Sequence, residues 1–302
     1  MPKGYFSKSG LEPRPTVASA LAWATRHLAE CLASPEREAQ LLLAASLGCP
    51  LTRLFADPLR FLEPAEQARV EAFVLRRQRG EPLAYLAGHR EFWSLDFRVN
   101  RHTLVPRPET EALIARALEL IPEGHPGRLL DLGTGCGVLA ITLARERPGL
   151  EIWATDQSRE ALAQARENAR VLQTPSIVFR NGDWFEALPG GLAFDWIVSN
   201  PPYLADHDPA LETDGIRFEP RQSLVSGPTG LEALCRIIKE SPHWLRAPGW
   251  LILEHAHDQA RTLATLLRAN GWQDAAGYPD VGGETQGTFA AWLGHPVPIH
   301  RG

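Results

Sequence analysis

The pattern of apolar side chains is helical in the N-terminal part of the chain. Between residues 16 and 80, apolar residues recur at the spacing that places them on one face of a helix. The pattern predicts three helices, each bounded by a capping residue, a proline or a glycine: one after Thr16, one from Ser34 to Gly48, and one from Pro64 to Gly80. These helices predict a small helical domain over residues 16–82. Residues 1–15 have little apolar content and predict a flexible lead-in.

The pattern changes after residue 82. Residues 83–105 alternate between polar and apolar side chains, as in Asp96-Phe97-Arg98-Val99, which predicts a β-hairpin that links two domains. From residue 106 onward, short apolar strands alternate with amphipathic helices, which predicts an α/β domain with a mostly parallel sheet covered on both faces. Strands are expected at 129–132, 152–155, 177–179, 194–199 and 250–253 and as a terminal pair, with helices at 108–121, 138–147, after Ser158, at 230–243 and at 258–269.

The stretch Asn200-Pro201-Pro202-Tyr203 lies where a strand must stop. It directly follows the apolar run 194–199, and prolines cannot continue the hydrogen-bond ladder of a sheet. Open α/β sheets bind their ligands at such strand ends. The Asn200 side-chain oxygen and the Pro201 carbonyl can together accept both hydrogens of a planar NH2 group, and Tyr203 can stack on its plane. These four residues are therefore the candidate substrate site. The alternative is a plain Pro-Pro turn entered through an asparagine.

The next segment, residues 204–228, has no clear helical or strand period. A loop of this length in a compact domain is usually functional or mobile. Because it comes directly after Tyr203, we interpret it as a loop that grips the substrate.

A glycine-rich loop follows the first strand of the α/β region. Its sequence is Asp131-Leu132-Gly133-Thr134-Gly135-Cys136-Gly137, and its glycines allow a ligand to approach the backbone at a helix N-terminus. A dinucleotide fingerprint would place a glycine where Val138 stands, so binding of the NAD type fits poorly. Three glycines at this spacing after an acidic residue favour S-adenosylmethionine, which has an amino acid tail and no pyrophosphate.

Two further strand ends carry residues suited to the same ligand. Asp156 ends the second strand, where a carboxylate can accept hydrogen bonds from both ribose hydroxyls. Asp183 and Trp184 follow the third strand and offer an acceptor and an aromatic face for an adenine ring. Each residue could instead be a helix cap, part of the core or part of a tight turn. Because the three features lie at successive strand ends, we favour a shared cofactor site.

Composition and charge narrow the classes of protein. The 302 residues are 44% hydrophobic, enough for about two domains with a sizeable core. A net charge of −5 without a long basic block disfavours binding to a nucleic-acid backbone. The 4 cysteines are scattered, which predicts reduced thiols. No apolar segment has the length of a signal peptide or a membrane span, so we expect a cytoplasmic protein.

A possible metal pair occurs in Glu254-His255-Ala256-His257, which follows a strand. No third ligand accompanies it at a suitable spacing. We therefore expect no metal site here, and a structural role for the histidine.

Together with other segments, these motifs resemble the release factor glutamine methyltransferases of the HemK or PrmC type. The resemblance runs from about residue 16 to about residue 292. It is carried by Asp131–Gly137, Asn200–Tyr203, Arg79-Gly80-Glu81-Pro82, Arg90-Glu91-Phe92-Trp93, Leu104-Val105-Pro106-Arg107-Pro108-Glu109-Thr110-Glu111 and Arg217-Phe218-Glu219-Pro220. The family usually has an arginine where Glu284-Thr285-Gln286-Gly287 stands in this chain.

The resemblance implies a Rossmann-like, seven-stranded class I S-adenosylmethionine-dependent methyltransferase domain over residues 106–302, with a helical substrate-binding domain before it. It implies methylation of the side-chain nitrogen, N5, of the glutamine in the Gly-Gly-Gln motif of class-1 peptide-chain release factors. We expect such an enzyme to act as a monomer, without direct contact to nucleic acid or membrane. The alternatives are an adenine-N6 DNA or RNA methyltransferase, with which Asn-Pro-Pro-Tyr is shared, a glutamine methyltransferase acting on a ribosomal protein, and a non-catalytic cofactor-binding module.

Overall fold

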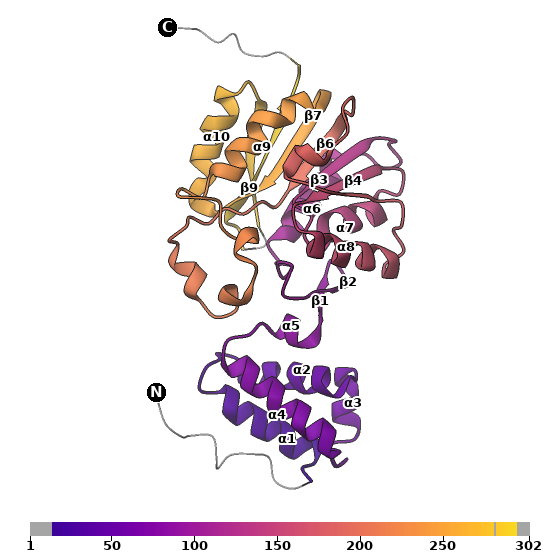
Figure 1. The fold of residues 1–302 in the computed structure, drawn as a ribbon, viewed down its shortest axis with the longest axis vertical. Coiled ribbons are helices and arrows are strands. Elements are labelled where there is room, and N and C mark those ends of the chain that lie inside the picture. The colour runs from indigo at the N-terminus through magenta and orange to yellow at the C-terminus, as the bar shows by residue number, and fades with distance from the viewer. Residues whose placement is uncertain (1–13, 281, 295–302) are drawn as a thin grey trace. The chain divides into compact units, whose positions relative to one another are not determined.

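The computed structural model describes residues 14–280 and 282–294, and it divides into two compact units. Unit 1 combines the chain up to Gly88 with Thr213–Phe218. Unit 2 combines His89–Glu212 with the chain from Glu219 onward (Figure 1). Most of the predicted lead-in, residues 1–13, lies outside the described residues.

Unit 1 is helical, as predicted. Its described helices are α1 (Val17–Leu28), α2 (Pro35–Leu47), α3 (Leu51–Ala56), α4 (Pro64–Gln78) and α5 (Leu83–Ala87). The three predicted helices are confirmed as α1, α2 and α4, and Thr16 caps α1 by accepting a hydrogen bond from the Ser19 N–H at 3.2 Å. The short helices α3 and α5 were not predicted, because five or six residues are too few to establish a helical period.

Part of the predicted substrate-gripping loop folds onto unit 1. The Gly215 N–H donates a hydrogen bond of 2.9 Å to the Gly80 carbonyl. Arg217 donates to the Arg79 carbonyl and lies 3.0 Å from an Asp214 carboxylate oxygen. Gly80 has a φ of 87°, a left-handed conformation that glycine adopts without strain. Within unit 1, Arg79 and Gly80 thus meet Gly215 and Arg217 at this turn.

Unit 2 has the predicted α/β architecture, preceded by a hairpin of β1 (His89–Phe92) and β2 (Leu95–Arg98). The hairpin was expected over residues 83–105; it is shorter because residues 83–87 form α5. The described strands of the main sheet are β3 (Arg128–Leu132), β4 (Glu151–Asp156), β5 (Val178–Asn181), β6 (Phe194–Ser199), β7 (Leu245–Glu254), β8 (Gln273–Pro279) and β9 (Thr285–Trp292). Its α-helices are α6 (Thr110–Leu120), α7 (Val138–Glu146), α8 (Arg159–Val171), α9 (Glu232–Glu240) and α10 (Ala260–Ala269).

The seven strands have the order β5-β4-β3-β6-β7-β9-β8. Strands β3 to β7 run parallel, and β9 lies antiparallel between β7 and β8. The predicted fold class is therefore confirmed. Successive residues of a strand face opposite sides of the sheet, so β3 places Leu129 in one apolar core and Leu130 in another. Helices α6, α7 and α8 contribute to the first core, and α9 and α10 to the second.

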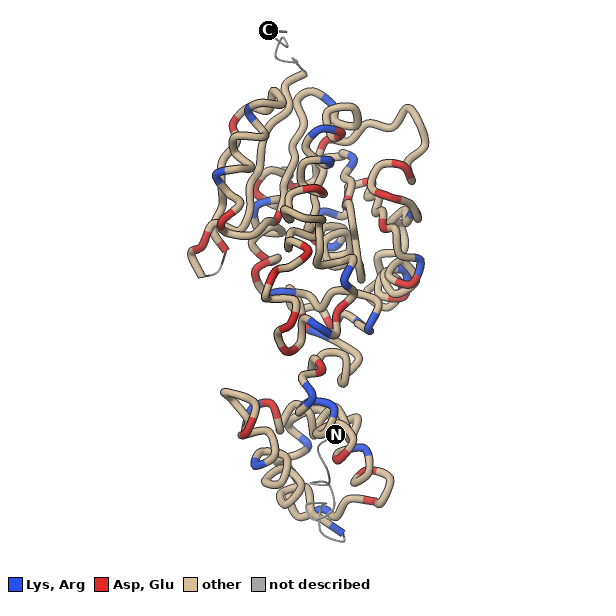
Figure 2. Tube along the Cα trace, turned by 60° about the vertical axis from the view of Figure 1, so that its left-hand side comes forward, with Lys and Arg blue, Asp and Glu red and all other residues tan. Residues whose placement is uncertain are grey.

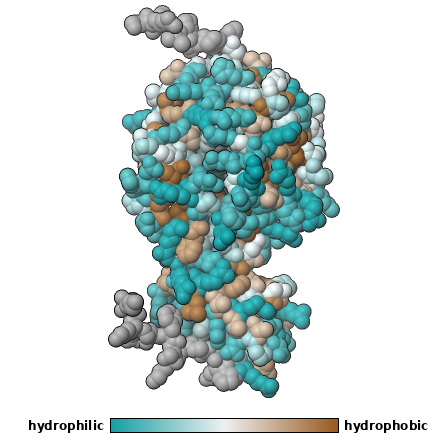
Figure 3. Space-filling model, viewed as in Figure 1, coloured by the Kyte–Doolittle hydropathy of each residue, from teal (hydrophilic) through white to brown (hydrophobic). Residues whose placement is uncertain are grey.

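The face of the molecule drawn in Figure 3 is mostly polar, and charges of both signs occur along the chain. On the face drawn in Figure 3, hydrophobic residues form small separate patches among hydrophilic ones. Basic and acidic residues are interspersed along the traced chain in Figure 2. Many of them form ion pairs, such as Arg77 with Glu38 in unit 1 at 2.9 Å. No helix among the described residues has both the length and the apolar character that a membrane crossing would require.

Candidate functional site

A cavity opens in unit 2 where the parallel strands end. It holds about 920 Å³ of space that no atom fills, part of which is open solvent. Its lining includes residues from the loops after four adjacent strands: Gly133, Thr134, Gly135 and Cys136 after β3, Asp156 at the end of β4, Asp183 and Trp184 after β5, and Asn200 and Pro202 after β6. The cavity lies at the switch point between β3 and β6, from which the sheet grows in both directions.

Asp131 holds the glycine-rich loop in place through hydrogen bonds. This side chain is fully buried, and its carboxylate accepts hydrogen bonds from the Thr134 hydroxyl at 2.6 Å and the Ala140 N–H at 3.2 Å. Burial raises the pKa of Asp131 to about 7. Neither Asp131 nor Gly137, both predicted to bind the cofactor, lines the cavity. Asp131 therefore supports the loop that forms the wall.

Gly133 lies close to the Trp184 ring. Its φ is 71°, and a Cβ at this position would lie 3.3 Å from the ring of Trp184. A side chain here would press on the indole at the cavity wall. The loop after β3 and the loop after β5 therefore meet across this glycine.

Asp156 connects two loops at the cavity. One carboxylate oxygen accepts the Gly135 N–H at 2.9 Å, and the other accepts the Ser158 N–H at 2.8 Å. Burial raises the pKa of Asp156, while these two hydrogen bonds act in the opposite direction. Because each carboxylate oxygen has two lone pairs, Asp156 can still accept hydrogen bonds from two hydroxyls of a ligand.

Asp183 has a partner that the sequence did not reveal. Its carboxylate forms an ion pair with Arg236 of α9, which also binds Glu186 at 2.9 Å and Glu240 at 2.9 Å. The next residue, Trp184, has a φ of 47°. Arg236 thus fixes the segment that carries the indole into the cavity wall.

The acceptor motif is anchored on both sides. The Asn200 side-chain N–H donates to the Thr110 hydroxyl oxygen at 3.0 Å, and Thr110 is buried at the first position of α6. The Tyr203 carbonyl accepts a hydrogen bond of 2.9 Å from Gln259. Pro201 is buried and Tyr203 half-buried, and neither lines the cavity, whereas Asn200 and Pro202 do.

Two buried acidic residues beside this motif, Glu254 and Glu219, were not predicted as site residues. Glu254, at the end of β7, is buried, and its carboxyl group lies within hydrogen-bonding reach of Thr110, Asn200 and Tyr203. Glu219 is also buried; it accepts the Val105 N–H at 3.0 Å and pairs with Arg107, which lines the cavity. Glu254 could have been found, because it ends an apolar strand as Asp156 does. Glu219 lies 112 residues from Arg107, and no local pattern connects them.

The histidine after Glu254 has a structural role, as expected. His255 is fully buried, and its ring nitrogens lie 2.7 Å from the Thr288 hydroxyl and 2.8 Å from the Ala256 carbonyl oxygen. Burial lowers the pKa of His255, which favours the neutral ring. Within residues 14–280 and 282–294, no group of three or more His, Cys, Asp or Glu side chains is placed to hold a metal ion.

Two family models match this chain. The model described as "PrmC N-terminal domain" matches residues 19–88, and that described as "Methyltransferase small domain" matches residues 110–216. The first match falls in unit 1. The second contains the glycine-rich loop and the acceptor motif.

Curated proteins are similar over most of the chain. A release factor glutamine methyltransferase of Vibrio cholerae serotype O1 is 40% identical over 281 residues, which cover 92% of this chain and 97% of that protein. A protein with the same name from Xylella fastidiosa strain 9a5c is 43% identical over 244 residues, covering 81% and 88%. One from Pseudomonas aeruginosa is 40% identical over 259 residues, covering 86% and 93%.

Solved structures share the fold at lower identity. The hMettl16 catalytic domain, solved in complex with the MAT2A 3'UTR hairpin 1, aligns with a TM-score of 0.55 and 20% identity, covering 78% of this chain and 84% of that one. The delta-N METTL16 methyltransferase domain aligns with a TM-score of 0.51 and 21% identity, covering 67% and 90%. These likenesses place the sheet of unit 2 in the class I methyltransferase fold.

Proposed function

The chain belongs to the release factor glutamine methyltransferase family, and we propose that it methylates the side-chain amide nitrogen, N5, of the glutamine in the Gly-Gly-Gln motif of class-1 release factors. The observation that carries this proposal is the position of Asn200. Its carboxamide lies on the wall of the cavity, and its N–H group is bound to Thr110. The Asn200 oxygen is thereby left to accept a hydrogen bond from a second amide.

The cavity suits S-adenosylmethionine, which would supply a methyl group on a positively charged sulfur. Gly133 leaves room for the ligand beside the Trp184 ring, and a flat adenine can pack on that ring. Asp156 has free lone pairs for ribose hydroxyls. The acidic character of this wall also favours a cationic ligand. These features support the proposed cofactor.

The proposed chemistry depends mainly on positioning. An amide nitrogen is a weak nucleophile, because its lone pair is delocalised into the carbonyl group, so it must be held in line with the methyl carbon. The Asn200 side-chain oxygen and the Pro201 carbonyl accept its two N–H bonds, while Tyr203 packs on the amide plane. As positive charge develops on the nitrogen, these acceptors bind it more strongly than in the ground state. A strong base is unnecessary, because the methylated nitrogen loses its proton readily.

In this proposal the helical domain, residues 16–82, binds the release factor, and residues 106–302 carry out the transfer. Support comes from the segment Thr213–Phe218, which follows the acceptor motif in sequence and packs within the helical unit. The chain that leaves the acceptor site therefore passes through the unit assigned to the partner. Binding of the release factor to this unit can be measured with a variant that lacks the Arg217 side chain.

Mass spectrometry tests the proposed reaction. The protein is incubated with S-adenosylmethionine and a purified class-1 release factor, and the peptide with the Gly-Gly-Gln motif is analysed. We expect this glutamine to gain the mass of one CH2 group, and Asn200→Ala to prevent the gain. Parallel reactions contain adenine-rich DNA, RNA or ribosomal protein. Methyl transfer to one of these and not to the release factor would contradict the proposal.

A further inference from the structure

Glu254 is a buried acidic residue beside the acceptor motif, and the reaction proposed above does not use it. It is 3% exposed, and its Oε2 atom has no hydrogen bond of good geometry among the described residues. Its carboxyl group lies within reach of Thr110 at the start of α6 and of Asn200 after β6. A buried carboxylate with incomplete hydrogen bonding is costly, so its retention here needs a reason.

We propose that Glu254 is a positioning residue that sets the orientation of the Asn200 carboxamide; this inference rests on the proposed function. An ionised carboxylate can only accept hydrogen bonds, so the edge of Asn200 that faces it must be the NH2 group. The Asn200 oxygen is then turned away from Glu254, toward the substrate. In the opposite orientation the Asn200 NH2 group would face the NH2 group of the glutamine. Two groups of donors cannot hydrogen-bond to each other, so the substrate amide would lose one of its acceptors.

Thr110 favours the same orientation of the Asn200 carboxamide. Its hydroxyl hydrogen can be donated to the Glu254 carboxylate, which leaves the Thr110 oxygen free to accept the Asn200 N–H at 3.0 Å. One hydrogen of the Asn200 NH2 group is thus bound to Thr110, and in our proposal the Glu254 carboxylate accepts the other. The Tyr203 hydroxyl faces the same carboxyl group. Asn200 and Tyr203 are therefore both neighbours of one buried residue, Glu254.

The constraint depends on the charge of Glu254. A protonated carboxyl group can donate a hydrogen bond to the Asn200 oxygen and would permit the wrong orientation. Burial and the nearby Glu109 raise the pKa of Glu254 to about 7, against the lowering effect of Thr110, Asn200 and Arg107. The Tyr203 and Tyr278 hydroxyls also face this charge, and the pKa of each is raised. Orientation of Asn200 should therefore improve as pH rises through the pKa of Glu254.

The variant Glu254→Gln preserves shape but can both donate and accept. Removing a group that binds the transition state typically lowers kcat by about 10²–10³-fold. A partly misoriented Asn200 should lose less, about 10- to 100-fold, with little change in KM for the release factor or Kd for the cofactor. The rise of kcat with pH near Glu254's pKa should disappear. The control is Asp195→Asn, the same chemical change at the other end of β6, which should leave kcat and its pH profile unchanged.

A double-mutant cycle separates positioning from general structural support. If Glu254 acts through Asn200, Glu254→Gln should cause no further loss of kcat in an Asn200→Ala background. An equal loss in both backgrounds would overturn the inference. So would an unchanged kcat for Glu254→Gln beside an active wild type.

A measurement on the wild type needs no turnover. The side-chain amide signals of Asn200, followed by NMR, should titrate with the pKa of Glu254, and this titration should be absent in Glu254→Gln. A flat Asn200 titration overturns the inference whether or not the release factor is methylated. Failure to methylate the release factor, with the titration present, contradicts only the proposed function.

Discussion

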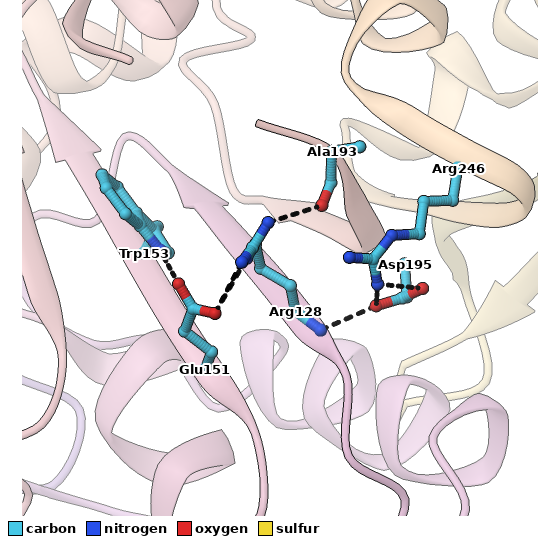
Figure 4. Close-up of polar contacts among 6 residues, drawn as sticks. All are labelled: Arg128, Glu151, Trp153, Ala193, Asp195 and Arg246. Atoms are coloured by element: carbon cyan, nitrogen blue, oxygen red, sulfur yellow. Dashed lines mark hydrogen bonds and ion pairs between the residues drawn. The ribbon is translucent and has the colours of Figure 1, made fainter. Parts of the chain in front are cut away.

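The two edges of the parallel sheet in unit 2 hold acidic residues in contrasting states. At the edge where the strands begin, Arg128 of β3 donates to Glu151 of β4 at 2.8 Å, and Arg246 of β7 binds Asp195 of β6 at 2.7 Å (Figure 4). Asp195 also accepts the Arg128 N–H at 2.7 Å. Trp153 completes the cluster by donating to Glu151 at 2.8 Å. These carboxylates are paired and partly exposed.

At the edge where the strands end, Asp183 and Glu219 are paired with arginines, but Asp131 and Glu254 form no ion pair among the described residues. Asp131 and Glu254 are buried, and each has one oxygen without a hydrogen-bond partner among the described residues. Burial raises the pKa of each to about 7, whereas the Arg128 hydrogen bond lowers the pKa of Glu151. One edge of the sheet is thus arranged for stability. The other keeps unsatisfied polar groups beside the cavity, where residues of perturbed pKa are typical of function.

The strongest test of this contrast uses the two ends of strand β6. Asn200→Ala removes the acceptor at the cavity edge and should lower kcat by about 10²–10³-fold, since one preorganised hydrogen bond to the transition state is lost. The Kd for S-adenosylmethionine, measured by calorimetry, should change little. Asp195→Asn, at the opposite end of the strand, should keep normal kcat. Comparable loss of kcat in both variants would remove the functional difference between the edges.

A second test follows the free energy of unfolding with pH. The folded-state pKa of Asp131 and Glu254 lies above the unfolded value, so their ionisation opposes folding. Stability is therefore highest below the unfolded pKa and is lost as pH rises toward about 7. The loss on full ionisation should be about 4 kcal/mol for Asp131 and about 3 kcal/mol for Glu254.

Urea unfolding at several pH values measures this effect. In Glu254→Gln and Asp131→Asn, the loss of stability with rising pH should be smaller than in the wild type. Glu151→Gln should not reduce it, because the pKa of Glu151 is lowered and its contribution is lost only as pH falls through that pKa. The opposite result would be a wild-type free energy of unfolding that rises with pH over this window, by the same amount as in the three variants. It would contradict the raised pKa of the buried carboxyl groups.

A third test concerns the cofactor wall. Asp156→Ala removes the acceptor of the Gly135 and Ser158 N–H groups and the proposed ribose contact. Hydrogen bonds to charged groups are worth about 1.5–3 kcal/mol, so cofactor Kd should rise by about 10- to 100-fold. Asp156→Asn, which keeps one acceptor oxygen, should show a smaller increase. An unchanged Kd in calorimetry would exclude Asp156 from the binding site.

The smallest effect is expected at the edge where the strands begin. Glu151→Gln weakens a surface ion pair with Arg128, and such pairs contribute about 0–1 kcal/mol. The difference from the wild type should shrink further at high salt, because exposed charges are screened. Thermal unfolding at low and high salt measures it. A loss as large as that expected for the buried carboxyls would mean that the two edges are energetically alike.

The sequence predicted those parts of the site that depend on local order. Strand ends are marked by apolar runs, so Asp156, Trp184 and Asn200 could be assigned to successive loops, and the rules for parallel sheets bring such loops together. The principal helices were predictable for the same reason. Helices α3 and α5 were not, since each is shorter than two helical turns.

The long-range contacts that hold the site residues in place could not be predicted in the same way. Arg236 reaches Asp183 from a helix 53 residues away, and Asn200 reaches Thr110 across 90 residues. Both contacts depend on how helices pack on the sheet, which periodicity does not determine. The interpretation of residues 254–257 shows the same limit. The histidine in that motif attracted attention, but it contacts Thr288, whereas the carboxyl group of Glu254 faces the acceptor motif.

The division of the helical unit into two pieces of sequence limits how the protein can be recombined. The chain passes between units after Gly88, after Glu212 and after Phe218. A deletion or exchange that ends at Gly88 would separate Arg79 and Gly80 from Gly215 and Arg217, their hydrogen-bond partners. A functional chimera between relatives must therefore transplant both pieces together. The helical unit includes part of the loop that follows the acceptor motif, so it cannot be exchanged as an independent module.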